Sequence, residues 1–160
     1  MKIINRQKNN NGFSLIEVVI TCAIITICVF ALMSSASKSI QVSGQALRQA
    51  QATLLIEEGV EAVKTIRDND WTTISNLNIS TNYYLSFNNI WSLSTTPSTV
   101  DGIFTRKVVI SAVYRDSNDD IATSGTLDTG TKKVTVTTSW NKPSGTVNKS
   151  LSFYISNIFN

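Results

Sequence analysis

One carboxylate stands inside the most apolar part of the sequence. Glu17 is the only charged residue among the 21 positions from Phe13 to Met33, and the next charge is Lys38. A carboxylate inside a membrane segment costs on the order of 2.5–3.5 kcal/mol on insertion scales, which indicates a functional role. We therefore expect another group to neutralise Glu17. The alternative is a carboxylate that reaches toward water and has no specific role.

Few other side chains could do chemistry. Histidine is absent, which excludes imidazole metal sites and His-dependent catalytic triads. Cys22 and Cys28 would lie about 9 Å apart along a helix, too far for a disulfide, so we expect small apolar packing residues. No serine has a base nearby in a known activating pattern. We therefore predict that the chain is not an enzyme and has no cofactor.

One acidic loop is a candidate for binding calcium. Asp116, Asn118 and Asp120 have the spacing that begins an EF-hand. Ile121 stands where that loop needs glycine, and Leu127 stands where it needs a bidentate glutamate, so the EF-hand interpretation fails. We expect a solvated turn between two strands, with a different oxygen-ligand calcium site as the alternative.

The segment that carries Glu17 is long enough to cross a bilayer. As a helix, Phe13 to Met33 would span about 31 Å. Residues 1–12 before it are polar and basic, so the positive-inside rule predicts a cytoplasmic N-terminus and a C-terminal domain outside. A secretory signal peptide cleaved near Ala36 is the alternative, and it leaves Glu17 unexplained.

The net charge of +3 belongs to the N-terminus. Residues 1–12 hold Lys2, Arg6 and Lys8, and the rest of the chain has equal numbers of basic and acidic residues. No basic stripe with interleaved aromatic residues follows. We therefore predict no direct binding of nucleic acid.

A short motif joins these features. After the basic leader comes the run G-F-S-L-I-E-V at residues 12–18. In this run the chain resembles type IV prepilins and type II secretion pseudopilins. The resemblance implies cleavage by prepilin peptidase between Gly12 and Phe13, followed by N-methylation of Phe13. It also implies that Glu17 pairs with the N-terminal amine of a neighbouring subunit, which would give each buried charge a partner.

The same resemblance implies partners and a location. The partners are prepilin peptidase, other pilin or pseudopilin subunits, an inner-membrane assembly platform and membrane lipid. The subunit would be a single-pass membrane protein before assembly, and then part of a filament at the cell surface or in the periplasm. Major pilins often carry proline inside the apolar helix, but none occurs between Phe13 and Gln41, and Ser34 holds one usual proline position. We therefore favour a minor pilin, with a pseudopilin as the alternative.

The helix is predicted to continue beyond the apolar segment. Residues 34–70 contain no proline, and the composition of 45–67 favours a helix. Helical spacing gives one apolar stripe, which consists of Leu55, Ile56, Gly59, Val60, Val63 and Ile66. Asp68 and Asp70 oppose the helix dipole and are expected to end the helix, and a carboxylate metal site is the alternative interpretation. Trp71 is expected to fold back onto the helix.

Residues 71–160 are predicted to form an antiparallel sheet of about four strands. The strands are marked by alternating apolar residues: Tyr83, Leu85 and Phe87; Phe104, Val108, Ile110, Ala112 and Tyr114, with Arg106 at the edge; Val134, Val136 and Trp140; Leu151, Phe153 and Ile155. Residues 141–145 are typical of a hairpin loop. The expected fold class is α+β, with a long N-terminal helix packed against this sheet, and the pilin resemblance implies the same architecture.

These expectations divide the chain and suggest a role. The divisions are a cleaved leader (1–12), a transmembrane and assembly segment (13–33), an exposed helix (34–70) and a sheet head (71–160). The implied role is a structural subunit of a type IV pilus-like filament. From another class, an unassembled single-pass surface receptor or adhesin remains open, as does a soluble exported binding module.

Overall fold

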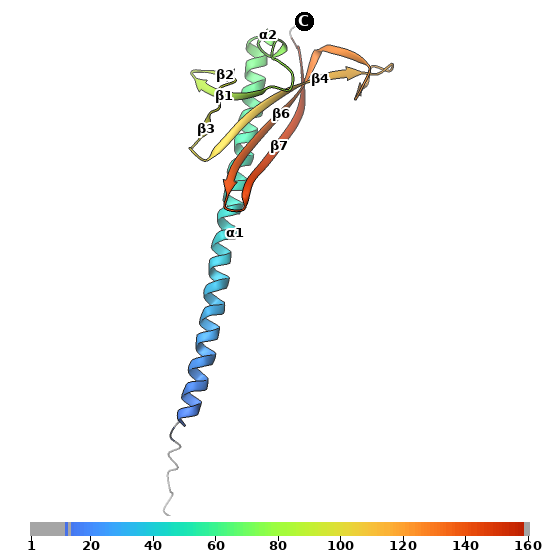
Figure 1. Cartoon of the computed structure of the whole chain (residues 1–160). Coiled ribbons are helices and arrows are strands. Elements are labelled where there is room, and N and C mark those ends of the chain that lie inside the picture. Colours follow the sequence, from blue (N-terminus) through green and yellow to red (C-terminus); the bar gives the residue numbers. More distant parts are fainter. Residues whose placement is uncertain (1–11, 13, 159–160) are drawn as a thin grey trace, which may run out of the picture. The chain divides into compact units, whose positions relative to one another are not determined.

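The computed structural model describes residue 12 and residues 14–158 of the chain. Its elements, in chain order, are α1 (Leu15–Asn69), α2 (Trp71–Ser75), β1 (Asn82–Asn88), β2 (Ile90–Ser94), β3 (Thr99–Val100), β4 (Phe104–Arg115), β5 (Ile121–Ala122), β6 (Thr126–Lys142) and β7 (Gly145–Ser156) (Figure 1). The chain divides into two compact units, Met1–Ala46 and Leu47–Asn160, and the boundary between them falls inside α1.

The strands form one antiparallel sheet. The hydrogen-bonded order is β2-β1-β4-β6-β7, and β3 and β5 each pair with β4. The predicted α+β class, with a long helix followed by an antiparallel sheet, is confirmed. Over the described residues the sheet has seven strands rather than about four. The additional strands, β2, β3 and β5, are two to five residues long, too short for an alternating pattern to stand out.

The core of the second unit lies between α1 and the sheet. Its main cluster combines Ile56, Ala62, Val63 and Ile66 of α1 with residues of the sheet that include Val108, Ile110, Val134 and Val136. A smaller cluster contains Ala52, Phe104 and Trp140, with the two aromatic rings edge to face at 5.9 Å. The predicted helical stripe is therefore confirmed, although Leu55 and Val60 are only partly buried.

A bulge changes the register of β4. The pairing between β4 and β6 shifts between Ala112 and Val113. After the shift Val113 takes the buried face, and Tyr114, which was expected there, is 37% exposed. Two other apolar residues of the predicted strands also lie outside the core, since Phe87 is at the β1–β2 turn and Leu151 is on an edge strand.

The end of α1 follows the prediction. The helix ends at Asn69, and Asp70 then caps α2 by accepting a hydrogen bond from the Thr72 amide at 2.9 Å. Trp71 is partly buried and packs against the main core cluster. The predicted hairpin loop is also present, since Lys142 pairs with Gly145 across a two-residue turn.

Candidate functional site

The predicted processing and assembly residues lie at and just before the start of α1. Gly12 and Ser14 are exposed and precede the helix. The Ser14 carbonyl accepts hydrogen bonds from the amides of Glu17 at 3.0 Å and Val18 at 3.2 Å, so the helix begins at Leu15. Phe13, the predicted methylation site, lies outside the described residues. Cleavage after Gly12 and methylation of Phe13 therefore stay predictions.

Glu17 lies in the first turn of α1 and is exposed. An anion in a first helical turn is favoured by the partial positive charge of the free amides there. Within the described part of the chain, no Lys or Arg forms an ion pair with Glu17. The carboxylate thus keeps its capacity to accept a cationic partner from another chain.

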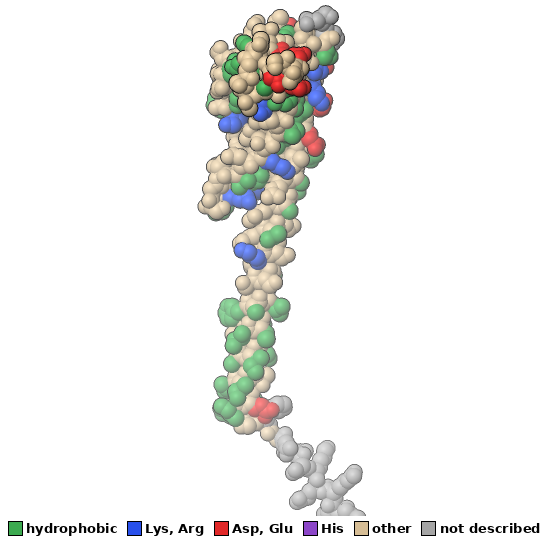
Figure 2. Space-filling view, turned by 90° about the vertical axis from the view of Figure 1, so that its right-hand side faces the viewer, with side chains coloured by type: hydrophobic (Ala, Val, Ile, Leu, Met, Phe, Trp, Pro, Cys, Tyr) green, Lys and Arg blue, Asp and Glu red, His purple; other side chains and the backbone are tan. Residues whose placement is uncertain are grey.

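The first part of α1 exposes apolar side chains around its whole circumference. Every residue from Leu15 to Gln51 is exposed, and Leu15, Phe30 and Leu32 are 82%, 69% and 70% exposed. Figure 2 shows these hydrophobic side chains along the helix. A helix that is apolar on all faces belongs in lipid or among other helices. By length and composition α1 could cross a membrane, which suggests membrane anchoring.

The two cysteines belong to this apolar surface. Cys22 and Cys28 are free and exposed. The Thr26 hydroxyl donates to the Cys22 carbonyl at 2.7 Å, and the Thr21 hydroxyl donates to the Glu17 carbonyl at 2.7 Å. These bonds satisfy the hydroxyl groups inside the helix, so the segment presents few unsatisfied polar groups to an apolar environment.

The candidate calcium residues lie together in the loop between β4 and β5. The Asp116 carboxylate accepts hydrogen bonds from the amides of Asn118 at 2.8 Å and Asp120 at 3.1 Å. Asp119 has a φ of 67°, which closes the turn. No group of three or more His, Cys, Asp or Glu side chains in metal-binding arrangement occurs among the residues that the structure describes. The geometry is that of a turn held by its first aspartate.

An ion pair anchors the base of this loop. The Arg115 Nε lies 2.7 Å from Asp128 Oδ2, and the Arg115 guanidinium also donates to the Asp119 carbonyl at 2.7 Å. The other oxygen of Asp128 accepts from the amides of Gly130 and Thr131. The hydrogen bond from Arg115 is the main reason that the pKa of Asp128 lies below its ordinary value.

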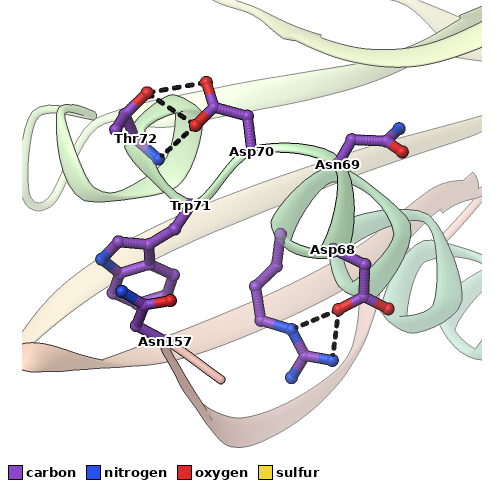
Figure 3. Close-up of a pocket in the computed structure, with 7 residues that line it drawn as sticks. Asp68, Asn69, Asp70, Trp71, Thr72 and Asn157 are labelled. Carbon is purple, nitrogen blue, oxygen red and sulfur yellow. Dashed lines mark hydrogen bonds and ion pairs between the residues drawn. The ribbon is translucent and has the colours of Figure 1, made fainter. Parts of the chain in front are cut away.

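A pocket at the end of α1 contains the other candidate carboxylates (Figure 3). The Arg67 guanidinium lies 2.7 Å from Asp68 Oδ1. Asp70 accepts from the amide and hydroxyl of Thr72, and the hydroxyl bond is the main cause of its lowered pKa. Both carboxylates are thus engaged by protein donors, and their positions are explained by ion pairing and helix capping.

Sequence reasoning missed a buried cation at the interface of helix and sheet. Arg106 was expected at the edge of its strand face, but its side chain is only 4% exposed. Its Nη1 lies 2.9 Å from Glu58 Oε2 and donates to the Leu55 carbonyl at 3.2 Å, and the guanidinium stands 5.4 Å from the Trp91 ring centre. The sequence contains one indication of this burial. Arg106 lies at the alternating position between Phe104 and Val108, so its side chain is on the same face of the strand as theirs.

Comparison with known proteins locates the recognisable part of the chain at its N-terminus. Residues 7–33 match the family described as the prokaryotic N-terminal methylation motif. No curated protein and no solved structure matches the chain. Proteins with this motif form a structural family rather than an enzymatic one. Residues 7–33 of this chain therefore carry the prepilin-type cleavage and methylation signal of type IV pilins and pseudopilins.

Proposed function

We propose that the chain is a structural subunit of a type IV pilus-like filament. Prepilin peptidase cleaves it between Gly12 and Phe13 and methylates the new N-terminus, and the subunit then leaves the membrane for the filament. The observation that supports this most is the start of α1, where a methylation motif leads directly into a helix that is exposed and apolar on all faces. Such a surface needs lipid before assembly and other helices after it.

Glu17 would specify how these helices meet. Its carboxylate is the only charge between Phe13 and Met33 and has no cationic partner among the described residues. Removal of the leader creates an amine four residues away in sequence. Pairing of that amine with Glu17 of a neighbouring subunit satisfies both charges in an apolar surrounding and favours one stagger between helices.

A minor pilin fits this chain better than a major pilin. Helix α1 contains no proline, and its only glycines are Gly44 and Gly59. The first half of the helix therefore has no residue that would locally weaken its hydrogen bonds. The apolar helix and its signal fit a type II secretion pseudopilin as well, which is the second candidate within the same family.

The test is substitution of Glu17 in the native host. Glu17→Gln keeps the size of the side chain and removes its charge. We expect processed, methylated protein to remain in the membrane while the amount in sheared surface filaments falls at least about tenfold, because a buried amine loses its partner.

Thr21→Ala is the matched control, since Thr21 is one turn away and uncharged. Thr21→Ala should leave the amount of this subunit in sheared filaments at the wild-type level. A wild-type amount of the Glu17→Gln subunit in sheared filaments would contradict the pairing. Filaments that form with an unprocessed N-terminus would contradict the proposed route as a whole.

A further inference from the structure

Strand β7 is an open edge of the sheet. Along one side it pairs with β6, from Lys142 opposite Gly145 to Thr131 opposite Ser156, with no shift of register. It ends the strand order, so its other side has no strand partner in the part of the chain that the structure describes. The strand is 12 residues long and largely exposed.

This edge lacks the protection that edge strands usually have. Natural proteins shorten such strands or interrupt them with proline, bulges or projecting charges. Strand β7 has no proline, and its only charge, Lys149, is turned onto the helix, where Nζ lies 2.6 Å from Thr53 Oγ1. The opposite edge, β2, has only five residues. Among the strands that the structure describes, the long unprotected edge is therefore β7.

The hydrogen-bonding groups of β7 alternate between the two sides. The hairpin closes at Lys142 and Gly145, so the odd-numbered residues from Gly145 onward pair with β6. The Asn157 amide continues the pattern by donating to the Gly130 carbonyl at 3.0 Å. The even-numbered residues from Thr146 to Ser156 consequently direct their amides and carbonyls to the open side.

We propose that this edge is a self-association site, at which β7 of a second copy adds antiparallel about a twofold axis at Leu151. This register uses the whole strand. It sets Ser150 opposite the second copy's Ser152 on the polar face and Val147 opposite its Ile155 on the apolar face. Lys149 faces Phe153 of the second copy rather than another lysine, so no like charges are opposed. In this register, each amide on the open side of one β7 lies opposite a carbonyl on the open side of the other β7.

The strand direction decides which copies can pair. Lys149 contacts Thr53 near the start of the second unit, and Asn157 lines a pocket with Trp71 beyond the end of α1, so β7 and this part of α1 run in the same direction. Antiparallel addition reverses the second copy. The part of α1 that packs on the second copy's sheet therefore runs opposite to the same part of α1 in the first copy.

The test traps the contact with a single thiol in the full chain. Cys22→Ala and Cys28→Ala remove the native thiols, and Leu151→Cys adds one at a half-exposed site. In the proposed register the two copies of position 151 form a non-hydrogen-bonded pair with Cα atoms about 4.5 Å apart, within disulfide range. Mild oxidation in detergent should give disulfide dimers several-fold above those of Ser92→Cys on the β2 edge.

A proline substitution tests whether the dimers depend on backbone hydrogen bonds between the two strands or only on the closeness of the two thiols. Ser152→Pro removes an amide that points to the open side and is not used by β6. Added to Leu151→Cys, it should lower the dimer yield about fivefold or more, because two bonds are lost by symmetry. Ser152→Ala is the matched control, since both changes remove the Ser152 hydroxyl bond to Thr135.

Two results would overturn the proposal. One is a dimer yield for Leu151→Cys no higher than that for Ser92→Cys. The other is equal yields for the proline and alanine variants. The proposal goes beyond filament assembly, because these contacts lie in Leu47–Asn160 and form whether or not the leader has been cleaved.

Discussion

Gly59 lies where α1 packs tightly against the sheet. A methyl group at this position would lie 2.9 Å from Val136 Cγ1 and 3.2 Å from Arg106 Cδ, and both neighbours are buried. Gly59→Ala should therefore destabilise the second unit by about 1–3 kcal/mol in denaturant unfolding, despite the better helix propensity of alanine. At Gly44 nothing lies within 4 Å, so Gly44→Ala should cause no loss. Equal stability of the two variants would show that the helix can move away from the sheet.

Asp128 makes stability depend on pH. Its folded-state pKa lies below the ordinary value for an aspartate, mainly because Arg115 donates a hydrogen bond to the carboxylate. The unfolded chain then binds the proton more tightly, so the stabilisation is present above about pH 4 and is lost as the pH falls through the folded pKa. Thermal unfolding should show a smaller acid-induced drop for Asp128→Asn than for the wild type. The same drop in both would assign the acid sensitivity to other carboxylates, among them Asp70.

At the residue scale, an isolated charge is easier to recognise in the sequence than a burial that depends on distant contacts. Glu17 stands out because it is the only charged residue among the 21 positions from Phe13 to Met33. Arg106 does not stand out, since its partners Glu58 and Trp91 come from distant segments. The burial of Arg106 follows from tertiary contacts that no local pattern contains.

At the scale of elements, one ion pair connects helix and sheet. Glu58 on α1 is half exposed, whereas its partner Arg106 on β4 is buried. Glu58→Gln should cost about 1–2 kcal/mol of unfolding free energy, because the buried guanidinium loses its counter-charge while solvent moderates the effect.

Glu57→Gln is the control on the preceding, exposed position, which has no ion pair with a described residue. It should change stability by less than about 0.5 kcal/mol. Chemical denaturation measures both. If the two substitutions cost the same, the contact between Glu58 and Arg106 does not contribute to stability.

The long elements are predictable because their patterns repeat many times. The helical stripe and the alternation in β4 and β6 identify most of the core from the order of residues alone. The bulge at Ala112 and Val113 leaves no local signal, so the predicted position of Tyr114 is wrong, and Val113 takes the buried face instead. Short strands such as β3 and β5 depend on pairing with β4 and have no period of their own.

At the scale of the whole molecule, the α+β class and the processing signal both follow from the sequence. The signal lies in residues 7–33, where leader, glycine, glutamate and apolar helix must agree. The open edge of β7 does not follow, since strand order arises from distant pairings. The motif therefore indicates how the N-terminus is processed, whereas the proposed contact at β7 could be found only from the strand order.

The N-terminal mass of the protein, isolated from the membrane and sheared surface fractions of its native host, tests processing and assembly most directly. A processed subunit begins at Phe13 and carries one methyl group on its amine, and this is the expected result. A chain that still begins at Met1 would contradict the proposed function and favour an anchored surface receptor. A chain that begins near Ser37 would indicate ordinary secretion, and the proposed role of Glu17 would lose its basis.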